Sequence, residues 1–81
     1  ADNTRFLRLN HQAGMLDFYA TGSVHVLARV EAALRGRVLA GAAERCEGAW
    51  CHYLLARGYA WQAQHARSIR AIRRCRACSR C

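Results

Sequence analysis

The chain has 81 residues, of which 13 are basic and five are acidic, and its formal net charge is +8. That length suits one domain with a thin hydrophobic core, and an apolar fraction of 53% is too high for a disordered chain. No stretch approaches the roughly 20 apolar residues that a membrane-spanning helix needs. Because the chain begins with Ala1 and not with Met, we expect a processed product or a fragment.

Helical periodicity extends along most of the chain, and proline, which would interrupt it, is absent. We expect a single all-α domain, a small bundle of three to four helices that pack orthogonally or as stacked hairpins. The expected helices cover residues 4–20, 24–35, 37–46 and 49–75, followed by a basic, cysteine-rich tail over 76–81. Gly58 is the position at which the last helix would break.

The first helix carries an apolar stripe whose members recur at intervals of three and four residues. The stripe consists of Phe6, Leu9, Ala13, Leu16 and Ala20. This spacing predicts that the stripe faces the core. In the later helices the expected core residues are Val26, Leu27, Val30, Ala33, Leu34, Trp50, Tyr53, Leu54 and Leu55.

Charge is distributed unevenly along the chain, and every basic residue is arginine. Residues 1–47 hold six arginines and all five acids, whereas residues 48–81 hold seven arginines and no acid. An acid-free basic segment attracts polyanions such as nucleic acid, an anionic membrane surface or an acidic protein. The charge therefore predicts the chemistry of a partner and not the fold.

The segment from Trp61 to Cys75 is typical of a cationic amphipathic helix. Its apolar side includes His65 and Ile72, and its other side is rich in arginine. Guanidinium groups bind phosphates bidentately and stay charged at any relevant pH. A packed helix with a solvated arginine face has the same pattern, so that interpretation stays open. The candidate binding residues are Arg67, Arg70, Arg73, Arg74, Arg76, Arg80 and Trp61.

Five cysteines form the second candidate group, and the last three are spaced C-x-x-C-x-x-C. They are Cys46, Cys51, Cys75, Cys78 and Cys81. The spacing fits a zinc site whose fourth ligand would be Cys46, Cys51, His52 or His65. Alternatively, up to two disulfides form and leave one thiol for a partner chain. In a third interpretation all five are plain thiols.

Signatures of enzymes are absent from the sequence. The motifs G-x-x-x-x-G-K-[ST], G-x-G-x-x-G and G-x-S-x-G do not occur, and the four histidines belong to no zinc or triad motif. We therefore expect no catalytic residues and no enzymatic activity.

Three hypotheses of function follow. The leading one is a binding module that contacts the phosphate backbone of RNA or DNA through the arginine-rich C-terminal helix, with aromatic residues interleaved for stacking. The first alternative is a helical protein-interaction subunit or chaperone-like adaptor, in a homo- or hetero-oligomer, that binds an acidic or helical partner. The second alternative is a secreted, disulfide-stabilised cationic peptide that acts at membrane surfaces.

Overall fold

The computed structural model describes residues 3–78. Four helices follow one another in this range: α1 (Thr4–Thr21), α2 (His25–Leu34), α3 (Ala42–Trp61) and α4 (His65–Cys78). No strand occurs among the residues described. The predicted small all-α bundle is therefore confirmed. No helix within 3–78 is long and apolar enough to cross a membrane.

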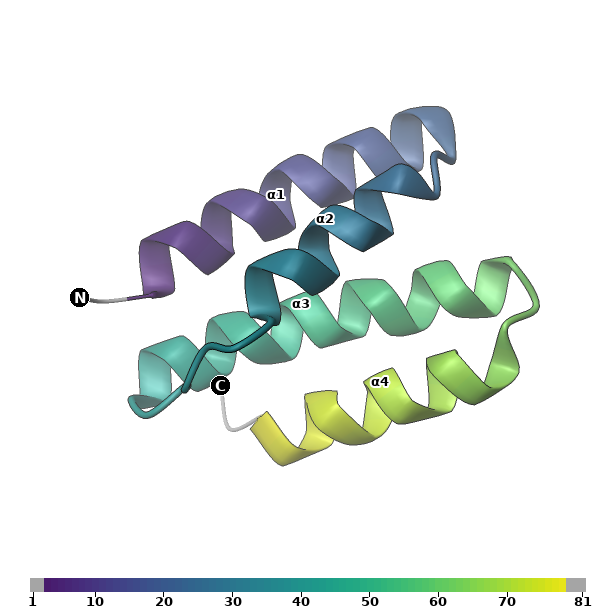
Figure 1. The fold of residues 1–81 in the computed structure, drawn as a ribbon. Coiled ribbons are helices and arrows are strands. Elements are labelled where there is room, and N and C mark those ends of the chain that lie inside the picture. The colour runs from purple at the N-terminus through teal and green to yellow at the C-terminus, as the bar shows by residue number, and fades with distance from the viewer. Residues whose placement is uncertain (1–2, 79–81) are drawn as a thin grey trace.

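The helices form two antiparallel hairpins, α1–α2 and α3–α4, which pack against each other (Figure 1). The central helix is α3, which packs against α1, α2 and α4. Within the described part of the chain, α4 packs against α3 alone. Its flank on the side of α2 is therefore left open.

The hydrophobic core lies where the two hairpins meet. Leu7 of α1, Val30 of α2 and Cys51 of α3 are fully buried at its centre. The core prediction is confirmed for six residues, namely Val26, Leu27, Val30, Ala33, Leu54 and Leu55. It is wrong for Trp50 and Tyr53, which are exposed on the surface of α3.

The predicted apolar stripe of α1 faces solvent, so its assignment to the core is wrong. Leu9 is 55% exposed and Leu16 is 67% exposed. The buried face of α1 instead contains Leu7, Gly14 and Phe18. A Cβ atom at Gly14 would lie 2.9 Å from a methyl carbon of Val30, so the glycine lets α2 approach closely. The helix is apolar on two sides, and the side with the glycine is the one that packs.

The predicted bounds of the last two helices are also wrong. Residues 37–40 are not helical, whereas residues 47–48, expected to separate two helices, lie within α3, which continues through Gly58 to Trp61. Residues 76–78, expected in the tail, belong to α4. A Cβ atom at Gly58 would lie 2.5 Å from a methyl carbon of Leu27, so this glycine permits close packing and does not break the helix. The break lies at residues 62–64, where Ala63 adopts a left-handed φ of 59°.

Candidate anion-binding groove

The face of α4 that packs against α3 is narrow. Ala71 is buried, Ile72 packs against the core, and the Ser68 hydroxyl donates a hydrogen bond of 2.8 Å to the Ala56 carbonyl oxygen. Small side chains at the contact bring the two helices close together. The arginines of α4 consequently project to the sides of the helix and outward.

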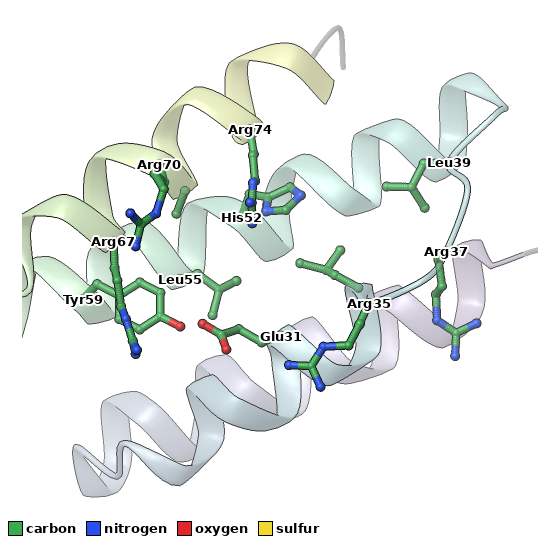
Figure 2. Close-up of a pocket in the computed structure, with 12 residues that line it drawn as sticks. Glu31, Arg35, Arg37, Leu39, His52, Leu55, Tyr59, Arg67, Arg70 and Arg74 are labelled. Carbon is green, nitrogen blue, oxygen red and sulfur yellow. The ribbon is translucent and has the colours of Figure 1, made fainter.

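One flank of α4 faces α2 across a groove with a cavity volume of about 510 Å³ (Figure 2). Such a volume lies within the roughly 300–1,000 Å³ of typical ligand pockets. Five arginines and one carboxylate line the groove, so it attracts anions. The lining residues are Glu31, Leu34, Arg35, Arg37, Leu39, His52, Leu55, Tyr59, Arg67, Arg70, Ala71 and Arg74.

The arginines on the two walls of the groove differ in whether other groups of the protein contact their guanidinium groups. Figure 2 shows Arg67, Arg70 and Arg74 extending from α4 toward the groove, with Arg35 on the opposite wall. Within residues 3–78, the guanidinium groups of Arg35, Arg70 and Arg74 form no hydrogen bond or ion pair. Arg67 is held over the ring of Tyr59, with its Cζ atom 5.7 Å from the ring centroid. The groove therefore presents cationic groups that are available to a ligand.

Arg37 lines the same groove but is engaged by the fold. Its guanidinium group donates to the side chain of Asn3 at 2.9 Å, and its Cζ atom lies 3.9 Å from the centroid of the Phe6 ring. These contacts attach the α2–α3 link to the start of α1. We therefore assign Arg37 a structural role at the end of the groove.

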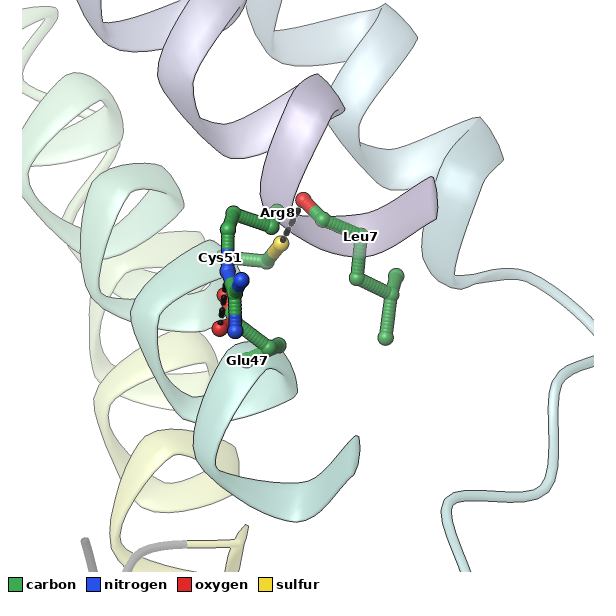
Figure 3. A network of polar contacts seen from close by, with 4 residues as sticks. All are labelled: Leu7, Arg8, Glu47 and Cys51. Carbon is green, nitrogen blue, oxygen red and sulfur yellow. Dashed lines mark hydrogen bonds and ion pairs between the residues drawn. The ribbon is translucent and has the colours of Figure 1, made fainter. Parts of the chain in front are cut away.

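The carboxylates that could neutralise the groove are mostly engaged elsewhere. Glu47 pairs with Arg8 at 2.8 Å (Figure 3), and Glu44 accepts a hydrogen bond from Asn3 at 2.9 Å. Among the described residues, Glu31 is the single carboxylate that lines the groove. The excess of positive charge is thus local to the groove as well as general to the chain.

His52 contributes to the groove floor from α3. Burial, with the nearby charge of Arg74 as a smaller cause, lowers the pKa of His52 from its ordinary value of 6.5. Its Nδ1 atom is buried and has no hydrogen-bond partner within the described range. At neutral pH the imidazole is therefore uncharged, so His52 adds no charge to the floor beneath the arginine walls.

The structure brings together three of the seven predicted binding residues: Arg67, Arg70 and Arg74 all line the groove. Arg73 and Arg76 are exposed on α4 outside it. Trp61 belongs to the end of α3 and lines a second, smaller cavity, and Arg80 lies outside the described residues. Sequence reasoning missed Arg35, and it considered His52 only as a zinc ligand, because no local pattern indicates that the end of α2 lies across a groove from α4.

Among the described residues, the cysteines do not gather into a metal site. No three His, Cys, Asp or Glu side chains within the described residues are placed to hold a metal ion. Cys46 is disulfide-bonded, which contradicts the interpretation of five plain thiols, whereas Cys51, Cys75 and Cys78 are free. The remaining candidate, Cys81, lies outside the described residues.

Cys51 is a core residue and not a reactive thiol. It is fully buried, and its Sγ atom is 3.7 Å from the carbonyl oxygen of Leu7, to which it donates (Figure 3). Burial, and secondarily the negative charge of Glu47, raises the pKa of Cys51 to about 12. The thiolate that nucleophilic chemistry requires is therefore disfavoured.

Comparison with known proteins finds no matching family model, no matching curated protein and no matching solved structure.

Proposed function

We propose that the protein is a non-enzymatic binding module that contacts the phosphate backbone of RNA or DNA through the arginines of α4. The observation that carries this proposal is the groove in which Arg67, Arg70 and Arg74 of α4 face Arg35 of the opposite wall. A guanidinium group is planar and presents a fork of N–H donors, so it pairs bidentately with two oxygens of a phosphate.

The shape of the groove favours contact with the backbone over reading of base edges. Its floor consists of α3 side chains that are largely buried, including Leu55 and Tyr59. Its polar groups are overwhelmingly cationic donors, which neutralise phosphates without distinguishing sequences. We therefore expect binding that depends strongly on salt and weakly on base sequence.

The test is a fluorescence-anisotropy titration of labelled nucleic acid over a series of salt concentrations. In the double variant Arg70→Ala with Arg74→Ala, we expect affinity to fall on the order of 10-fold. The slope of log K against log salt should fall by about 1.5, because each lost phosphate contact removes roughly 0.7–0.9. The matched control is Arg73→Ala with Arg76→Ala, which removes the same charge from α4 outside the groove and should have the smaller effect.

Two outcomes would contradict the proposal. One is an affinity and a salt slope that the groove variant leaves unchanged. The other is the absence of salt-dependent binding by the unaltered protein. Equal losses of affinity in the two double variants would show that the net charge of the chain alone governs binding. That result would exclude the groove as the binding site.

A second candidate function, a helical protein-interaction subunit, is favoured by the outer face of α1. Phe6, Leu9 and Leu16 are exposed along this face, on the side opposite the buried residues Leu7 and Phe18. Exposed apolar stripes of this kind mark surfaces that pack against another helix. Under this proposal the occupant is a helical partner, and the arginine groove remains a separate surface.

A further inference from the structure

A row of exposed side chains runs along α3 on the side away from the groove floor. The row consists of Trp50, Tyr53, Arg57 and Trp61, and we call it the aromatic stripe. Its members are three or four residues apart, so they share one side of the helix. At a rise of 1.5 Å per residue the stripe is about 17 Å long, which is enough to contact several nucleotides of an extended strand.

The rings of the stripe are accessible to a ligand. Trp50 is 49% exposed, Tyr53 is 38% exposed and Trp61 is 72% exposed. Tyr19 of α1 lies beside them and is 49% exposed. Trp50 packs partly on His11 and Trp61 partly on Phe18, and the remaining surface of each ring is open to a ligand. The stripe thus has the character of a binding surface.

Charge on the stripe is positive. The Cζ atom of Arg57 lies 5.8 Å from the ring centroids of both Tyr19 and Tyr53. No Asp or Glu residue occurs between Gly48 and Cys81, and Glu47 itself pairs with Arg8. Exposed rings interleaved with a guanidinium group complement a ligand that has planar rings on an anionic backbone.

The C-terminal end of the stripe opens into a second cavity of about 250 Å³. Phe18, Tyr19, Gly22, Trp61 and Gln62 line this cavity. The Nε2 atom of Gln62 is buried and has no hydrogen-bond partner within the described part of the chain. The aromatic lining of this cavity continues the exposed rings of the stripe.

We infer that the aromatic stripe stacks against the unpaired bases of single-stranded nucleic acid. The inference rests on the proposed nucleic-acid function and adds to it a contact with bases and a preference for single strands over duplex. In a duplex the base faces are stacked on one another, so the stripe cannot reach them, whereas an unpaired strand offers every face.

The test compares two probes with the same number of phosphates, a thymidine oligomer and an abasic oligomer. Both tryptophans of the chain belong to the stripe, so intrinsic tryptophan emission reports directly on this surface. We expect the thymidine oligomer to quench the emission and to bind about 5- to 150-fold more tightly than the abasic oligomer, the range that stacking of a single base supports. The abasic oligomer should bind through phosphates and leave the emission unchanged.

Variants locate the contact. Trp61→Leu should reduce the advantage of the thymidine oligomer, and Trp61→Phe should restore part of it, because a phenyl ring still stacks. Val24→Ala is the control, since Val24 is a half-exposed apolar residue that lies just before α2, outside both the aromatic stripe and the groove. Circular dichroism checks that each variant is folded. If Trp61→Leu is unfolded, Tyr53→Leu is used in its place.

The outcomes separate this inference from the function on which it rests. Equal, salt-dependent binding of the two oligomers with unchanged tryptophan emission would contradict base stacking on the aromatic stripe. The proposal of phosphate binding in the groove would remain. Absence of binding by either oligomer would overturn both. Base stacking on the aromatic stripe would also be contradicted if the thymidine oligomer quenched the emission equally in the unaltered protein, in Trp61→Leu and in Tyr53→Leu.

Discussion

His52 combines a place on the groove floor with a buried Nδ1 atom that lacks a hydrogen-bond partner among the residues described. Its lowered pKa has a consequence for stability. When the pH falls below the ordinary value of 6.5, the unfolded chain takes up a proton more readily than the folded chain does. The free energy of unfolding is therefore highest above pH 6.5 and falls on acidification. The pKa of His11 is lowered in the same direction, mainly by burial, and adds to this loss.

We predict that His52→Gln reduces the acid sensitivity of the fold. Glutamine does not titrate, so the variant should lose less thermal stability than the unaltered protein between neutral pH and about pH 5. Each protein is compared with its own value at neutral pH by thermal denaturation. His65→Gln serves as the control, because His65 is exposed on α4. A full acid-induced loss in the His52 variant would show that this histidine does not contribute.

Individual glycines show where sequence reasoning fails at the scale of the residue. Gly58 stands in a helical sequence, and a glycine there signals a break as readily as a close contact. Which of the two holds depends on Leu27, which is 31 residues earlier in the chain and packs over the glycine. Local sequence does not contain that information.

At the scale of the element, the α3–α4 hairpin is closed by a residue that carries no turn signal. Ala63 adopts the left-handed conformation, with φ 59°, although alanine is disfavoured there by roughly 1 kcal/mol. The Gln64 backbone N–H donates to the Tyr59 carbonyl oxygen at 2.9 Å and fixes this turn. The packing of α4 on α3 thus overrides the local preference of the residue.

We predict that Ala63→Gly stabilises the protein by about 0.5 kcal/mol, because glycine adopts a positive φ without steric cost. The gain is partial, since glycine also has more conformational freedom to lose on folding. Ala60→Gly, within the exposed last turn of α3, should destabilise by roughly 0.5–1 kcal/mol. Urea unfolding measures both changes. Destabilisation of similar size by both substitutions would contradict the assigned conformation of Ala63.

Periodicity identified the helical class and the core face of α2, because α2 is apolar along one side only. It misassigned α1, where the stripe of Phe6, Leu9 and Leu16 competes with a second apolar face. The helix end at Trp61 was missed because the following Gln-Ala-Gln sequence contains neither glycine nor proline. Both errors have one physical origin, which is that tertiary contacts between helices decide among locally equivalent choices.

At the scale of the whole molecule, half of the candidate site was accessible from the sequence and half was not. Arg67, Arg70 and Arg74 recur at helical spacing, so α4 alone places them on one flank. The opposite wall depends on the position of α2 over α3, which is a tertiary feature, and Arg35 was therefore missed. The groove exists because α4 packs against α3 without reaching α2.

The outer face of α1 and the net charge of +8 have opposing effects on association. The apolar stripe of α1 is nearly symmetric about Ala13. An antiparallel pair of α1 helices would therefore place Leu9 of one copy near Leu16 of the other. Burial of these leucines favours pairing, whereas like charge opposes it. Salt screens the repulsion between copies and leaves apolar contacts intact.

We therefore predict self-association that strengthens with salt, whereas binding of nucleic acid weakens with salt. Sedimentation velocity at low and high salt should show a larger dimer fraction at high salt. Leu9→Gln with Leu16→Gln should abolish the dimer, because it places polar amides in the paired stripe. Ile69→Gln is the control, since it removes an exposed apolar residue from α4 and should leave the dimer intact. A monomer at every salt and protein concentration would exclude a second copy of the chain as the occupant of this face. The apolar stripe of α1 would then bind a helix of a different protein.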